Sequence, residues 1–206
     1  PPAPKAAPAK RASRDIVFIL DRSGSMGGES IRAARAALDT AIDRLADGDR
    51  FNLIRFSDVT DSLFEEERAA EQSNRLFAKL YLRSTEASGG TMMQPALHKA
   101  LPASGRREET PRLRQVVFVT DGAVSNETGL FRDIRARLGA SRLFAVGIGS
   151  APNSYFMRKA AEAGRGSFVY IGDVSQVRAK MSSLLEKLEH PALTGLAHGW
   201  HGTGNT

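Results

Sequence analysis

Three short polar segments contain the residues of this chain that could hold a metal ion. The first is Asp21-Arg22-Ser23-Gly24-Ser25, which follows the apolar run 16–20 and precedes a long helical pattern. The second is the Gly-Gly-Thr of 89–91, and the third is the Thr-Asp-Gly of 120–122 at the end of the run VVFVT. Carboxylate and hydroxyl oxygens are hard ligands that suit Mg²⁺, which usually keeps waters or takes a ligand from outside. The segments therefore predict an oxygen-lined cation site, provided that the fold brings them together.

Alternating strand and helix patterns predict how these segments are positioned. Strands are expected at residues 16–20, 51–56, 59–64, 115–120, 142–148 and 166–171. Helices are expected at residues 29–46, 73–81, 93–101, 126–138, 153–163 and 177–188. Several strands are unbroken apolar runs, which is typical of parallel strands covered on both faces. We expect an α/β fold with a doubly wound, mostly parallel six-stranded sheet flanked by helices on both faces. Ligands bind such sheets outside the carboxyl ends of the strands, where the polar segments lie.

The composition is that of an ordinary folded domain. At 206 residues, with 41% hydrophobic and 25% charged residues, the chain can hold one α/β domain with a full core. No apolar run approaches the roughly 18 residues of a membrane span, and the first residues lack the apolar stretch of a signal peptide. The absence of Cys excludes disulfides, thiolate catalysis and Cys-bound zinc. The net charge of +6 favours acidic partners, although part of the excess lies in the first 14 residues.

Composition also divides the chain into three regions. Residues 1–14 carry four prolines in the first eight positions and are predicted to be a Pro/Ala-rich linker. Residues 15–190 carry the alternating pattern and form the expected domain. Residues 191–206 are Gly-rich and short of core residues, so we interpret them as a tail or a truncated continuation.

The polar segments, in this order and each in this strand context, resemble the metal-ion-dependent adhesion site of von Willebrand factor type A domains. The likeness covers roughly residues 15–189. The stretches QVVFVTDGAVSN (115–126) and VGIGSAPNSYF (146–156) look like the subgroup of inter-alpha-trypsin inhibitor heavy chains and of bacterial surface proteins that pair a VIT domain with this domain. Gly27-Gly28 stands where an integrin β chain carries acids for an adjacent calcium site, which implies a single metal here.

The resemblance implies both a metal site and a partner. The implied metal residues are Asp21, Ser23, Ser25, Thr91 and Asp121, holding Mg²⁺ with Mn²⁺ or Ca²⁺ as alternatives. If the hydroxyls bind directly and the two carboxylates act mainly through water, the metal stays electron-poor and seeks a Glu or Asp from a protein partner. The expected function is therefore adhesion-type protein binding without catalysis, by a monomeric domain of a larger protein.

The resemblance also implies a compartment. We expect an extracellular or bacterial cell-surface location, with the periplasm as an alternative, and no nucleic-acid binding or membrane insertion. The same domain type also occurs as an assembly or scaffold module of intracellular chelatase-type or nucleic-acid-processing complexes. That second reading stays open on the sequence alone.

Enzymatic alternatives fit the sequence less well. A serine hydrolase needs a Gly-x-Ser-x-Gly elbow, and neither Ser23 nor Ser25 stands in one. A Mg²⁺-dependent phosphatase with Asp21 as nucleophile usually needs a second acid in the same loop, where position 23 is Ser. The glycines at 147 and 149 lack the third glycine of a dinucleotide site.

The sequence also gives little support to a histidine metal site or to nucleic-acid binding. His198 and His201 have no third metal ligand in register and stand in the Gly-rich tail. No face shows the interleaving of basic and aromatic residues that is typical of nucleic-acid binding.

Overall fold

The computed structural model describes residues 13–101, 112–122, 126–149 and 153–189. The strands are β1 (Arg14–Asp21), β2 (Arg50–Phe56), β3 (Thr60–Ser62), β4 (Arg68–Ala69), β5 (Leu113–Thr120), β6 (Arg142–Ile148) and β7 (Phe168–Ile171). The helices are α1 (Glu29–Asp43), α2 (Gln72–Arg83), α3 (Met93–Ala100), α4 (Glu127–Arg137), α5 (Ser154–Ala163) and α6 (Val177–Glu189). Two short 3₁₀ turns are η1 (Gly24–Met26) and η2 (Val174–Gln176).

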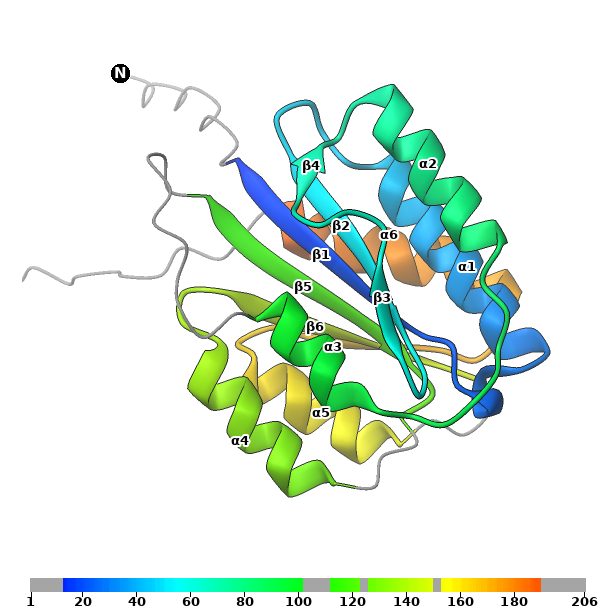
Figure 1. Ribbon diagram of the computed structural model, residues 1–206, viewed down its shortest axis with the longest axis vertical. Coiled ribbons are helices and arrows are strands. Elements are labelled where there is room, and N and C mark those ends of the chain that lie inside the picture. The colour runs from blue at the N-terminus through cyan, green and yellow to red at the C-terminus, as the bar shows by residue number, and fades with distance from the viewer. Residues whose placement is uncertain (1–12, 102–111, 123–125, 150–152, 190–206) are drawn as a thin grey trace, which may run out of the picture.

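The strands form one sheet in the order β3-β2-β1-β5-β6-β7 (Figure 1). β1 lies in the middle, parallel to β2 and β5, and β6 and β7 continue the parallel pairing. Among the described strands, only β3 and the two-residue β4, both next to β2, are antiparallel. The expected mostly parallel, doubly wound sheet is confirmed, and β4 is an additional short strand that the sequence did not reveal.

β3 is shorter than the strand expected at 59–64, and a side chain explains the difference. The Asn52 amide nitrogen donates to the Phe64 carbonyl at 2.9 Å, and the Asn52 amide oxygen accepts from the Phe64 backbone N–H at 3.1 Å. Beyond Ser62 the Leu63 N–H still donates to the Leu53 carbonyl at 2.8 Å, and at Phe64 this buried side chain of β2 takes the place of backbone pairing.

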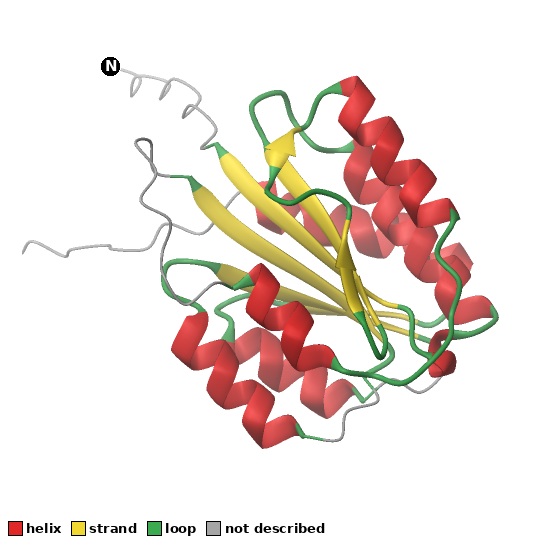
Figure 2. Cartoon of the chain, viewed as in Figure 1, coloured by secondary structure: helices red, strands yellow, loops and turns green. Residues whose placement is uncertain are grey.

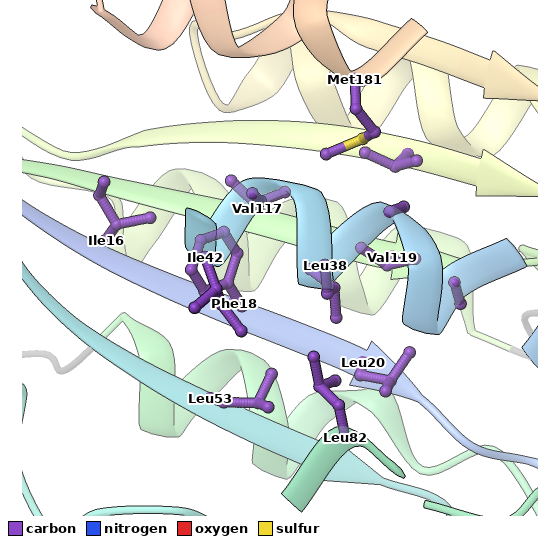
Figure 3. Packing of buried hydrophobic residues seen from close by; sticks show 14 of the residues in the cluster. Ile16, Phe18, Leu20, Leu38, Ile42, Leu53, Leu82, Val117, Val119 and Met181 are labelled. Atoms are coloured by element: carbon purple, nitrogen blue, oxygen red, sulfur yellow. The ribbon is translucent and has the colours of Figure 1, made fainter. Parts of the chain in front are cut away.

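Helices cover both faces of the sheet (Figure 2). The core on one face combines residues of α1, α2 and α6 with alternate residues of the strands, and α3, α4 and α5 enclose the other core. Along β1, Phe18 and Leu20 point into the first core and Val17 and Ile19 into the second. Figure 3 shows Phe18 and Leu20 beneath Leu38 and Ile42 of α1. The unbroken apolar run of β1 is therefore required by burial on both faces.

Side-chain caps set where two helices begin. Asn126 accepts a hydrogen bond from the Gly129 N–H at 3.1 Å at the start of α4, and Asn153 accepts one from the Phe156 N–H at 3.0 Å at the start of α5. The helices expected at 126–138 and 153–163 begin at these two residues, and Asn is a preferred residue at such caps. Among the residues described, no helix has the length and apolar character needed to span a membrane.

Candidate metal site

Asp21 ends β1, and its carboxylate is built into the fold. The residue is fully buried, with 0% of its surface exposed. One carboxylate oxygen accepts a hydrogen bond from the Ser23 N–H at 2.8 Å, and the other accepts one from the Thr120 hydroxyl at 2.5 Å. Leu20 pairs with Val119 across β1 and β5, so Asp21 comes opposite Thr120 at the carboxyl edge of the sheet. The strand register therefore fixes the orientation of the carboxylate.

Two serine hydroxyls lie together directly after Asp21. The Ser23 and Ser25 Oγ atoms are 3.1 Å apart. The turn η1 holds them in place, because the Met26 N–H donates to the Ser23 carbonyl at 3.0 Å. Ser23 is buried and Ser25 is exposed, so the pair reaches from the interior to the surface.

Backbone hydrogen bonds bring the segment that contains Thr91 to the same loop. The Gly24 N–H donates to the Gly89 carbonyl at 2.9 Å, and the Ser88 N–H donates to the Arg22 carbonyl at 2.7 Å. On the other side of Thr91, the Met92 N–H donates to the Ser57 carbonyl at 2.8 Å. Thr91 itself is half-buried. The loop after β1 and the segment before α3 therefore form one unit, which lies at the lower right of Figure 1.

The backbone favours glycine at position 89, and an exposed carboxylate lies close to it. Its φ is +80°, in the left-handed region that favours glycine. A Cβ at Gly89 would also meet a carboxylate oxygen of Asp58, an exposed side chain on the β2–β3 connection that would have to shift. The close approach of Asp58 to the Gly-Gly turn was not indicated by the sequence.

Asp121 follows β5 and is half-buried. Its carbonyl accepts a hydrogen bond from the Asn153 N–H at 3.1 Å, which ties the end of β5 to the start of α5. The Gly122 N–H donates to the Thr120 hydroxyl at 2.9 Å. Thr120 thus links the loop after β5 to Asp21, and the negative charge of Asp121 acts on Asp21.

Electrostatics at Asp21 favour a cation. Burial raises the pKa of Asp21, hydrogen bonds from Thr120 and Ser23 oppose that shift, and the charge of Asp121 raises the pKa further. Among the described residues, no Lys or Arg forms an ion pair with Asp21. A buried carboxylate with a second carboxylate nearby lacks compensation that a divalent cation would supply. The residues present therefore fit a metal ion.

The ligand chemistry points to hard oxygen donors. Within the described ranges, no group of three or more His, Cys, Asp or Glu side chains is placed to hold a metal. A cation at this edge would have to use the hydroxyls of Ser23 and Ser25 together with the carboxylates, which is the donor set of Mg²⁺ rather than of a zinc site built on His and Cys.

The predicted site residues lie on three connected segments. Asp21, Ser23 and Ser25 are joined by hydrogen bonds, Thr91 is brought in by its backbone neighbours, and Asp121 acts on Asp21 electrostatically. Sequence reasoning left the hydroxyl of Thr120 out of the site. Its position opposite Asp21 follows from the strand register, which the sequence does not show. His198, His201 and the tail lie outside the described residues, and β1 begins at Arg14, one residue before the expected domain start.

Comparison with known proteins agrees with this fold. Residues 14–170 match the model of the von Willebrand factor type A domain. A von Willebrand factor A domain-containing protein of Dictyostelium discoideum is 28% identical over 90% of this chain and 20% of its own length. Inter-alpha-trypsin inhibitor heavy chain H4 of Homo sapiens is 28% identical over 89% of this chain and 21% of its own length. The chain thus spans about a fifth of these relatives.

Solved structures show the same architecture. A von Willebrand factor type A protein from Catenulispora acidiphila superposes with a TM-score of 0.73 at 25% identity, over 85% of this chain and 42% of that one. Two more distant structures share the fold. They are the proximal thread matrix protein 1 of the mussel byssus with a zinc-occupied metal-ion-dependent adhesion site (TM-score 0.66, 16% identity, 86% and 46% covered) and the manganese-loaded TRAP protein of Plasmodium vivax (TM-score 0.66, 21% identity, 84% and 74% covered). The chain belongs to the von Willebrand factor type A domain family.

Proposed function

We propose that this domain binds a divalent cation and uses it to recognise an acidic residue of a protein partner. The hydroxyls of Ser23, Ser25 and Thr91 and the carboxylates of Asp21 and Asp121 would hold Mg²⁺, with Mn²⁺ or Ca²⁺ as alternatives. The observation that carries the proposal is the buried, uncompensated carboxylate of Asp21 beside two hydroxyls whose oxygens are 3.1 Å apart. The bound cation would supply the positive charge that attracts a partner's carboxylate.

The choice of ligands supports recognition rather than tight storage of the metal. Hydroxyls carry no formal charge, and both carboxylate oxygens of Asp21 already accept hydrogen bonds, one from Ser23 and one from Thr120. A cation held in this way keeps more of its charge for an external carboxylate than one held by several direct carboxylates. The net charge of +6 would also assist the approach of an acidic partner.

Adhesion or assembly at a cell surface is the setting we propose, in the extracellular space or the periplasm. The zinc- and manganese-loaded structures among the fold relatives support metal binding by analogy of fold. We propose no catalytic role. The one His among the described residues, His98, contacts Asp133 between α3 and α4 rather than the loops of the site.

Selection of peptides from a random phage-displayed library tests the recognition half of the proposal. Binders selected on the domain in Mg²⁺ should contain Asp or Glu, and replacing that acid by Asn or Gln should abolish binding. Binding should also be lost in EDTA and in Ser23→Ala. The matched control is Thr40→Ala, which removes a hydroxyl that bonds the Ala36 carbonyl within α1. Selected peptides that bind equally well in EDTA would contradict the proposal.

A further inference from the structure

A positive charge stands inside the metal-binding loop. Arg22 lies between Asp21 and Ser23, and its backbone is held on both sides. Its N–H donates to the Phe56 carbonyl at 2.9 Å, and its carbonyl accepts from the Ser88 N–H at 2.7 Å. A guanidinium in this position would repel a divalent cation unless its charge is directed elsewhere and compensated.

The side chain of Arg22 leads to Asp61 on β3. The Arg22 Nε and an Asp61 carboxylate oxygen are 3.9 Å apart, and neither atom has a hydrogen-bond partner among the described residues. The interaction between these two atoms is therefore electrostatic and not a hydrogen bond. The side chains are 21% and 37% exposed, so solvent screens the pair only in part.

Asp61 is itself held firmly by β2 and α2. Its other carboxylate oxygen accepts hydrogen bonds from the Arg55 Nε at 3.1 Å, from the Arg55 Nη2 at 2.5 Å and from the Tyr81 hydroxyl. The Arg55 guanidinium in turn stacks on the Tyr81 ring, 3.5 Å from its centre. The carboxylate that faces Arg22 is thus fixed by two neighbouring elements, as a preorganised countercharge requires.

Charges within this cluster act on Asp61. Burial alone would raise the pKa of Asp61, but the hydrogen bonds from Arg55 and Tyr81 and the charges of Arg55 and Arg22 outweigh burial and lower it. The charge of Arg22 therefore acts on Asp61.

We propose that Asp61 is a positioning residue for the metal site, which holds the guanidinium of Arg22 to the side of the loop and compensates its charge so that the loop can accept a divalent cation. The inference rests on the proposed metal binding and adds a determinant of metal affinity outside the ligand set. It also explains how the loop tolerates an arginine between two of its ligands.

A calorimetric charge-deletion cycle tests the proposal. Mg²⁺ and Mn²⁺ are titrated into the EDTA-stripped wild type, Asp61→Asn, Arg22→Gln and the double variant. Asp61→Asn should bind metal roughly tenfold more weakly, because the charge of Arg22 is then uncompensated near the cation. The double variant should return to within about twofold of the wild type, because the cluster of Arg22, Asp61 and Arg55 then has the same net charge of one positive unit as in the wild type. A merely structural role for Asp61 would leave the double variant as weak as Asp61→Asn.

Ionic strength provides a further test, because the loss of metal affinity in Asp61→Asn should become smaller at high salt concentration. Circular dichroism establishes that each variant is folded. If Asp61→Asn does not fold, Arg22→Gln alone decides the question: affinity equal to or above that of the wild type agrees with the proposal, and a loss contradicts it. Equal affinity of the wild type and a folded Asp61→Asn would overturn this inference and leave the proposed metal site intact. A wild type that binds no metal would overturn both.

Discussion

At the scale of single residues, Asp21 has a structural role that favours its ionised form and a buried position that disfavours it. Its carboxylate orients the loop through Ser23 and Thr120, and it is fully buried close to a second carboxylate. Folding raises its pKa above the reference value of 3.8, so the folded state favours the protonated form. The stability associated with this shift is therefore present below the unfolded pKa and is lost as the pH rises through the folded pKa.

Asp21→Asn should consequently separate stability from metal binding. At pH 7 without metal, we expect the free energy of unfolding of the variant to equal or exceed that of the wild type by about 1 kcal/mol, because a buried charge is removed. The gain should fade towards pH 3, where the wild-type carboxyl is protonated. Metal should raise the free energy of unfolding of the wild type and leave that of the variant unchanged. Urea unfolding with and without Mg²⁺ measures both effects, and a variant that metal still stabilises would contradict the role of Asp21.

Gly89 provides a second test at the residue scale. Gly89→Ala should cost about 1–3 kcal/mol, chiefly because alanine disfavours the positive φ, since the Asp58 carboxylate that its Cβ would meet is the end of an exposed side chain. Combining it with Asp58→Ala should recover little of this loss, because the backbone cost remains. Chemical denaturation of the two variants and of Asp58→Ala alone measures how much of the loss comes from the backbone and how much from the contact with Asp58. Full recovery in the double variant would show that backbone strain contributes nothing.

At the scale of elements, side-chain caps connect the helices to the site. Asn153 caps α5 and also donates its amide N–H to the Glu127 carboxylate on α4 at 2.8 Å. Its backbone N–H bonds the Asp121 carbonyl. Asn126 caps α4 through the Gly129 N–H.

The two caps predict unequal losses of stability. Asn126→Ala should lower the free energy of unfolding by about 1 kcal/mol, the usual cost of a lost cap. Asn153→Ala should cost more, because it removes both the cap and the bond between α5 and α4. Thermal unfolding of the pair measures the difference. Equal losses would show that the bond to Glu127 adds nothing to the stability of the fold.

Most elements could be predicted from the sequence, because burial on both faces and capping residues are local signals. The apolar run of β1 and the caps Asn126 and Asn153 belong to this group. The end of β3 could not be predicted, since it depends on the side chain of Asn52 bonding Phe64 across the sheet. The residues of the candidate site followed from motif order, whereas the contacts of Thr120 with Asp21 and of Arg22 with Asp61 depend on strand pairing.

At the scale of the whole molecule, the two edges of the sheet carry different kinds of polar groups. The carboxyl edge holds the loops of the candidate site. The amino edge holds a buried ion pair in which the Arg14 Nε donates to an Asp49 carboxylate oxygen at 3.0 Å, with both side chains 3% exposed. Arg112 bonds Asp15 beside it at 2.7 Å. The charges at this edge compensate one another, whereas no Lys or Arg among the described residues forms an ion pair with Asp21.

The buried pair should therefore stabilise the fold without affecting the site. Asp49→Ala should cost about 3–5 kcal/mol, because the charge of Arg14 stays buried without its partner. Metal affinity of the folded fraction should be unchanged. Urea unfolding and calorimetry check the two statements. Glu29→Ala, which removes an exposed ion pair with Arg32, is the control and should change stability little.

The central claim is that the carboxyl edge holds one divalent cation, and calorimetric titration of the EDTA-stripped domain with Mg²⁺, Mn²⁺ and Ca²⁺ tests it most directly. We expect one site per chain in the wild type and in Thr40→Ala, and loss of binding in Ser23→Ala, whose hydroxyl has Ser25 as its hydrogen-bond neighbour. Absence of binding by the wild type, or undiminished binding by Ser23→Ala, would contradict the account.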